Sequence, residues 1–184
     1  MIKLYNNSHF EDATLKTILT CAAKAVRCRI ARGVVVKVTR GGRSWRLAST
    51  ATGCRSVRRY LLVRNGGKRW IETDGGFVVI RPQHRRLEDD FLRVASRFYR
   101  TCCHELGHVR DWQRKEPFDH KRMPWESRIQ EIRAEEYADI AMGILNDQEA
   151  PPELEDALLE LATQWEAYYI RRGWHRFQTT KREA

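Results

Sequence analysis

Apolar residues recur every three or four positions between Phe10 and Ile30, which is the period of an α-helix with one buried face. Ser8 and Glu11 stand three residues apart at the beginning of this stretch, and such a pair is typical of a capping box. Gly33 follows the last apolar position, where a helix end is expected. The first element is therefore predicted to be an amphipathic helix that starts at Ser8.

Between this helix and residue 81 the pattern changes to short β-branched and aromatic runs separated by glycine-rich turn signals. The runs predicted as strands are 34–38, 59–63, 70–72 and 77–80. The last two flank Asp74-Gly75-Gly76, which predicts a hairpin between them. The stretch 44–56 is interpreted as strand plus loop.

Three more helices are expected after the strands. Apolar positions keep helical spacing from Leu87 to about Lys115, an acidic helix follows over Pro124–Ala141, and a last helix begins at Pro151 and ends near Gly173. The order of elements predicts an α+β fold in which the helices group against one small sheet. We expect a single domain over 1–184, with a helix-plus-sheet part in 1–86 and a helical part in 87–184.

The composition indicates the cellular compartment in which the protein is expected. The chain has 184 residues, and no apolar run approaches the 18 that a membrane span needs. The N-terminus has no signal-peptide core. Five cysteines, an odd number without paired spacings, indicate reduced thiols. The sequence therefore predicts a cytoplasmic protein with Cys21 and Cys28 as core residues on the first helix.

Charge divides the chain into two halves. Residues 1–86 hold 19 Lys and Arg against 4 Asp and Glu, a net charge of +15, whereas residues 87–184 carry −5. A basic half interleaved with aromatic residues favours nonspecific contact with nucleic acid. The arginines proposed for this contact are Arg43, Arg46, Arg58 and Arg59. A solvated surface or pairing with the acidic half would account for the same charge, and no recognised nucleic-acid motif accompanies it.

The strongest chemical signal is His104-Glu105-Leu106-Gly107-His108 on the second predicted helix. Residues four apart share one face of a helix, so His104 and His108 can direct two imidazoles at one zinc ion. Glu105 lies beside the pair and can take a proton from a zinc-bound water. The arrangement is the His-Glu-x-x-His motif of zinc metallopeptidases. A catalytic zinc ion needs a third protein ligand, which a glutamate of the following acidic helix can supply.

That acidic helix carries a family resemblance. Glu135-Glu136-Tyr137-Ala138-Asp139 resembles the Glu-x-x-x-Asp element of thermolysin-like peptidases, the gluzincins, and also the Glu-x-x-Ala-Asn of small bacterial and phage metallopeptidases that cleave repressors. The resemblance covers residues 104–141. It implies that Glu135 is the third zinc ligand and that Asp139 orients a zinc-binding histidine. It also implies a minimal zincin fold, in which a sheet edge above the zinc ion receives the substrate as an added strand.

Other residues compete for roles in this site. Asp111 lies three positions after His108, but pairing with a neighbouring basic residue, or orienting a ligand, is preferred to a ligand role for it. His120 would complete an all-histidine site similar to that of SprT-like proteases, which act on proteins crosslinked to DNA. Tyr99 and Tyr137 are candidate donors to the oxyanion, but tyrosines at helical spacing are more often core residues.

The sequence as a whole predicts a cytoplasmic zinc-dependent metallopeptidase, a hydrolase of bacterial or phage type. In this interpretation His104, His108 and Glu135 bind Zn²⁺, Glu105 is the general base, and the partner is a protein or peptide substrate. Two alternatives remain: an SprT-like protease acting on DNA-bound proteins, and a non-enzymatic basic nucleic-acid-binding protein with a structural metal. A closed site with a fourth protein ligand would favour the last of these.

Overall fold

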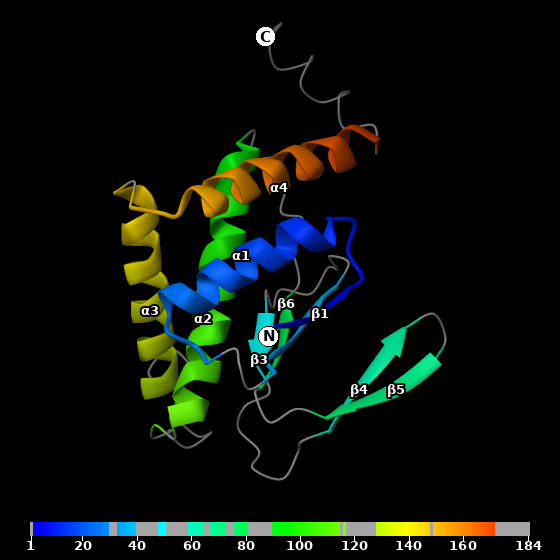
Figure 1. The fold of residues 1–184 in the computed structure, drawn as a ribbon, viewed down its shortest axis with the longest axis vertical. Helices are drawn as coiled ribbons and strands as arrows, with labels where there is room; N and C mark the ends of the chain where they lie inside the picture. Colours follow the sequence, from blue (N-terminus) through cyan, green and yellow to red (C-terminus); the bar gives the residue numbers. More distant parts are fainter. Residues whose placement is uncertain are drawn as a thin grey trace, which may run out of the picture.

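The computed structural model describes residues 2–29, 33–39, 48–50, 59–64, 67–72, 76–80, 90–114, 116, 128–147 and 149–171. Within these ranges it has an α+β fold of four helices and six strands (Figure 1). In chain order the elements are β1 (Lys3–Asn6), α1 (Asp12–Ala25), β2 (Val35–Val38), β3 (Ala48–Thr50), β4 (Arg59–Arg64), β5 (Gly67–Glu72), β6 (Phe77–Ile80), α2 (Phe91–Arg114), α3 (Ile129–Asn146) and α4 (Pro152–Arg171).

The larger sheet has the strand order β1-β2-β6-β3. Strands β1, β2 and β6 are parallel, and β3 runs antiparallel to β6 at one edge. The inner strands β2 and β6 are short and mainly apolar, and the face formed by Val36, Val38, Val78 and Ile80 is fully buried. Strand β1 was not expected from the sequence, because its half-buried Lys-Leu-Tyr-Asn pattern acquires strand character only by pairing with β2.

The predicted hairpin between 70–72 and 77–80 is wrong. Strand β5 pairs instead with β4, in a separate two-stranded sheet whose register joins Arg64 to Gly67 (Figure 1). Asn65-Gly66 stands between those partners in the sequence and is a strong two-residue hairpin signal. Strand β6 lies in the larger sheet between β2 and β3, where its Val78 and Ile80 side chains are fully buried.

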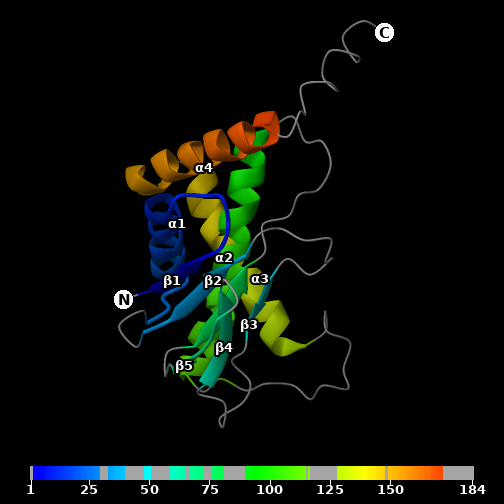
Figure 2. The same ribbon diagram turned by 90° about the vertical axis from the view of Figure 1, so that its right-hand side faces the viewer.

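Helix α2 is the central element. It contacts the other three helices and also strands β3 and β6, and both views show it running through the middle of the molecule (Figures 1 and 2). Its predicted apolar stripe is buried, with Cys102, Leu106 and Val109 fully enclosed. The side chains that meet this stripe from α1 and α4 are also fully buried: Leu15, Ile18, Leu19, Leu161 and Trp165. The core therefore encloses one side of the helix that carries the histidine motif.

Helix α1 is shorter than predicted at both ends. It begins at Asp12, and its N-cap Glu11 makes no side-chain cap hydrogen bond, so the predicted capping box with Ser8 does not form. It ends at Ala25, well before Gly33, because Arg27 adopts a left-handed φ of 55°. The N–H groups of residues 27 and 28 then bond the carbonyls of residues 24 and 23, a Schellman ending that glycine usually forms.

The next two helices also start later than predicted. Asp90 is not helical, and its Oδ1 accepts the N–H of Arg93 at 3.0 Å, so Asp90 caps α2 and Leu87 cannot be its start. Arg128 has an extended backbone as the N-cap of α3, which runs on to Asn146. The expected helix over Pro124–Ala141 is therefore shifted toward the C-terminus, and 124–127 lie outside the described residues.

Four cysteines lie in the described part of the chain, and all four are buried free thiols: Cys21, Cys28, Cys102 and Cys103. Cys28 lies beyond the end of α1 rather than on it, and its thiol donates to Oε1 of Gln113 on α2 at 3.8 Å. None of the helices in the described ranges is long and apolar enough to cross a membrane.

Candidate metal centre

Helix α2 brings the two histidines of the motif together. They are one turn apart on one face, and their Nε2 atoms approach to 3.1 Å with the rings nearly perpendicular, at 89°. Leu106 and Val109, on the opposite side of the same turns, are buried in the core and fix the rotation of the helix. The imidazoles of His104 and His108 therefore converge at the boundary between core and surface.

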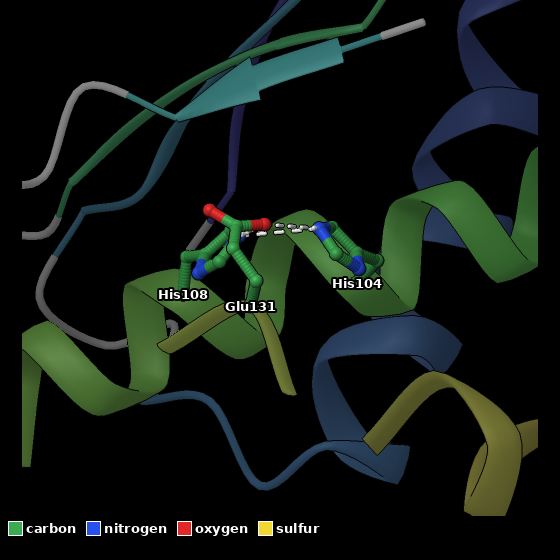
Figure 3. Close-up of side chains that lie close together, drawn as sticks. All are labelled: His104, His108 and Glu131. Atoms are coloured by element: carbon green, nitrogen blue, oxygen red, sulfur yellow. Dashed lines mark hydrogen bonds and ion pairs between the residues drawn. The ribbon is translucent and has the colours of Figure 1, made fainter. Parts of the chain in front are cut away.

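Helix α3 supplies a carboxylate to the same point. Oε2 of Glu131 lies 3.5 Å from Nε2 of His104 and 3.3 Å from Nε2 of His108 (Figure 3). Zinc ligands at about 2.0–2.2 Å from a tetrahedral ion lie about 3.3–3.6 Å from one another. The three atoms thus have nearly the spacing of one face of a zinc tetrahedron, and two imidazoles with one carboxylate are a donor set that catalytic zinc uses.

The three donor side chains are partly exposed to solvent. The exposed fractions of the side chains are 14% for His104, 10% for His108 and 20% for Glu131. Among the described residues, these are the histidine, cysteine, aspartate and glutamate side chains grouped closely enough to hold a metal ion. Three protein donors and partial exposure leave room for a fourth, non-protein ligand, as catalytic zinc sites require.

The electrostatics of the group favour a bound cation. Burial opposes ionisation of Glu131, but its contacts with His104 and His108 outweigh burial and lower the pKa of Glu131 to about 2. Burial likewise acts to lower the pKa of His104, yet the hydrogen bond with Glu131 and the charges of Glu105 and Glu135 raise it overall. A carboxylate that stays ionised between two imidazoles attracts either protons onto the rings or a metal ion in their place.

The structure thus places Glu131, and not Glu135, beside both Nε2 atoms. Glu135 lies one turn further along α3, where its Oε1 is 3.1 Å from the other ring nitrogen of His104, Nδ1. This Nδ1 is buried, and no acceptor of the described residues is in line with it for a hydrogen bond. The carboxylate of Asp139 meets Nη2 of Arg100 at 2.7 Å instead of a histidine. Glu135 therefore has the orienting position that the resemblance implied for Asp139, and Glu131 has the position implied for Glu135.

The register of two antiparallel helices accounts for this difference. A Cβ atom on Gly107 would lie 2.8 Å from Cδ2 of Tyr137, so α3 approaches α2 closely at the motif's glycine. Buried Asp111 accepts from Nε of Arg133 at 2.6 Å and from the hydroxyl of Tyr137 at 2.9 Å. These contacts set Glu131 opposite the histidine pair. The sequence shows two glutamates one turn apart, but it does not tell which of them the helix packing brings to the histidine pair.

The structure describes most of the other residues that the sequence suggested for roles in the site. Glu105 is buried, and its charge acts on His104 from the adjacent position of the helix. Asp111 and Tyr137 bind each other between the helices, and Tyr99 is a core side chain whose pKa is raised by burial. Asp111 pairs with Arg133 rather than with the neighbouring basic residues that its sequence position suggested. His120 lies outside the described residues.

The structure does not describe the side chains of the arginines that are predicted to contact nucleic acid. Arg43, Arg46 and Arg58 lie outside the described residues, and of Arg59 the structure describes only the backbone in β4. Sequence reasoning missed Glu131 and Arg100 as members of the site. A signal for both was present, because residues 100, 104 and 108 and residues 131, 135 and 139 are spaced one helical turn apart.

Comparisons with known proteins returned no match for this chain among protein-family models, curated proteins or solved structures.

Proposed function

We propose that this protein is a zinc-dependent metallopeptidase. The observation that carries the proposal is the triangle of Nε2 of His104, Nε2 of His108 and Oε2 of Glu131, with sides of 3.1–3.5 Å. These donors come from two helices whose packing is held by further contacts on both sides, so contacts within the protein position the group. Two histidines and a glutamate that are partly exposed to solvent fit catalytic zinc better than structural zinc.

The roles of the residues follow from their places. His104, His108 and Glu131 would hold the ion. The chemistry that zinc would supply there is a coordinated water with its pKa lowered to about 7 and a polarised carbonyl. Glu105 follows the first histidine directly and is buried, and in this proposal it would take a proton from the attacking water and pass it to the leaving amine. Glu135, beside Nδ1 of His104, would hold that imidazole with its other nitrogen free for the metal.

The sheet suggests where a peptide would bind. Strand β3 is antiparallel to β6, has no second partner among the described strands, and contacts α2. An extended peptide can add to such an edge through main-chain hydrogen bonds. We therefore propose a zincin-like arrangement in which β3, and not β6, is the edge that receives the substrate, since β6 lies between two other strands.

The alternative functions differ in what they require of the site. A structural metal would need a fourth protein ligand, and an SprT-like site would need a third histidine. The third donor among the described residues is a glutamate, which supports the gluzincin-like interpretation over both. The basic half still favours contact with nucleic acid as an additional property, because its net charge of +15 is concentrated in residues 1–86.

The test is a comparison of zinc content and peptide hydrolysis in purified variants. We expect wild-type protein to contain one zinc ion per chain and to cleave members of a peptide library. Glu105→Gln should retain zinc and lose hydrolysis, because the amide cannot accept the proton. Glu136→Gln, an exposed position of α3, is the matched control and should change neither property. Zinc-loaded wild-type protein without hydrolysis of any peptide or protein substrate would contradict the proposal.

A further inference from the structure

Six side chains alternate across the interface between α2 and α3, and we call this series the interhelical ladder. Its members, from one end to the other, are His108, Glu131, His104, Glu135, Arg100 and Asp139. Neighbours along the ladder are separated by 3.3, 3.5, 3.1, 2.5 and 2.7 Å. Each helix contributes residues one turn apart, so basic groups of α2 and acidic groups of α3 interdigitate.

Arg100 is the permanently charged member of the ladder. One guanidinium nitrogen, Nη2, donates to Oε2 of Glu135 and to Oδ1 of Asp139. The remaining oxygen of the Glu135 carboxylate is the atom that lies 3.1 Å from Nδ1 of His104. Arg100 therefore binds one oxygen of the Glu135 carboxylate, while the other oxygen of that carboxylate faces His104.

We propose that Arg100 is a positioning residue for the metal centre, which keeps Glu135 against Nδ1 of His104 and so keeps Nε2 of that imidazole directed at the metal. The inference rests on the proposed zinc site, but it concerns binding of the ion and needs no peptidase activity. Arg100 pairs with Glu135 and Asp139 and not with the three proposed ligands. It acts through Glu135.

The exposed fractions of the Glu135 and His104 side chains explain why Glu135 needs a partner that holds it in place. The Glu135 side chain is 43% exposed, so without a partner its flexible stem would sample several rotamers in water. The His104 side chain is only 14% exposed, and its Nδ1 is buried. If Glu135 turned away, this nitrogen would lose its nearby carboxylate while remaining shielded from water. Asp139 gives Arg100 a second anchor, which fixes the guanidinium on this side of α3.

A double-mutant cycle of zinc affinity tests the proposal. Loss of a group that holds a metal-binding histidine typically weakens metal binding about 10–100-fold. We expect Arg100→Met to weaken zinc binding about tenfold in competition with a chelator, and Glu135→Gln to weaken it at least as much. In the double variant the Arg100 substitution should add no further loss, because its effect passes through Glu135. Arg100→Lys should recover part of the affinity, and the exposed control Arg93→Met should match wild type.

A spectroscopic readout separates positioning from a general loss of packing. In the zinc-loaded protein, nitrogen NMR of the histidine rings should show His104 bound through Nε2 with its proton on Nδ1, and Arg100→Met should shift the Nδ1–H signal without shifting those of His108. Unchanged zinc affinity in Arg100→Met, or losses that add fully in the double variant, would overturn the proposal. Wild-type protein that binds zinc but hydrolyses nothing would contradict the proposed function alone, and wild-type protein without zinc affinity would overturn both.

Discussion

At the scale of single residues, two glutamates one turn apart on α3 have different surroundings and therefore different roles. The Glu131 carboxylate meets the Nε2 atoms of both histidines, and its side chain is 20% exposed. The Glu135 carboxylate lies between Nδ1 of His104 and Arg100 and is 43% exposed. The first position suits a metal ligand, and the second suits a group that orients one.

Substitution of these two glutamates should therefore give unequal effects. Glu131→Gln should weaken zinc binding by more than about 100-fold, whereas Glu135→Gln should weaken it by about 10–100-fold, the range for partners of metal ligands. Competition with a chelator measures both constants. If both variants lost zinc affinity equally, or if Glu135→Gln lost more, the result would support Glu135 as the third ligand.

The buried thiols make stability sensitive to alkaline pH. Burial raises the pKa of Cys28 to about 12 from a usual value near 9, so the folded protein holds this proton more tightly than the unfolded chain does. The stabilising effect is complete below pH 9 and is lost as the pH rises toward 12. One such thiol contributes a slope of about 1.4 kcal/mol per pH unit in that window. Urea unfolding at pH 9–11 should show a shallower slope for Cys28→Ala than for wild type, and equal slopes would count against a buried thiol here.

At the scale of elements, the packing of α2 against α3 determines the site. The helices are antiparallel, and the glycine of the histidine motif lets them approach, with Asp111, Arg133 and Tyr137 bonded beside it. Arg110 adds a contact by lying 4.0 Å over the Tyr137 ring. Tyr137 is thus held on two sides and cannot move easily if the space at the glycine is filled.

Gly107→Ala should consequently destabilise the protein. Overpacking a tight contact costs about 1–3 kcal/mol, which exceeds the gain of up to about 1 kcal/mol from replacing a helical glycine by alanine. Gly143, on α3, is the matched control, because a Cβ there meets nothing within 4 Å. Gly143→Ala should stabilise the protein slightly in chemical denaturation. Zinc affinity should also fall for Gly107→Ala, since α3 carries Glu131, and a Gly107→Ala variant as stable as wild type would contradict the close approach.

The sequence predicts elements well where local pattern decides and poorly where distant contacts decide. The predicted apolar stripe of α2 is confirmed as a mainly buried face, since helical spacing alone specifies it. The end of α1 was misplaced, because Arg27 takes a backbone conformation that its residue type disfavours. The partner of β5 was misassigned because two turn signals competed and only tertiary packing chose between them. The same limit applies to the site, where residue types indicated a histidine pair with a glutamate but register selected Glu131.

At the scale of the whole molecule, the two halves carry opposite charge and different parts of the proposed chemistry. The basic half, 1–86, contains the sheet strands, and the acidic half, 87–184, contains the donor residues. Among the described residues, an ion pair between the halves joins Lys24 to Glu153 at 3.9 Å, and both side chains are more than half exposed. An exposed ion pair of this kind contributes little to stability. The separation of charge between the halves therefore matters mainly for attracting oppositely charged partners.

The basic half should bind nucleic acid electrostatically and without sequence preference. Each neutralised phosphate contributes about −0.9 to the slope of log affinity against log salt for duplex DNA. Reversal of Arg43, Arg46, Arg58 and Arg59 to Glu should weaken binding and flatten this slope without changing zinc content. Reversal of the exposed Arg93 and Arg171 in the acidic half is the control and should have a smaller effect. Absence of binding to labelled DNA even at low salt would show that the charge serves solubility or internal pairing.

The way α3 is attached has a consequence for how an ion would enter and leave. Helix α3 packs mainly on α2 and only weakly on α1, and it adds Ala138 and Ala141 to a core whose other helical members come from α1, α2 and α4. Detachment of α3 would therefore separate Glu131 from the histidines while leaving most of the core assembled. Metal release would then follow a local opening whose free energy is smaller than that of global unfolding. Amide hydrogen exchange would register it as faster exchange confined to residues 129–146 after chelation, with α1 and α4 as protected as before.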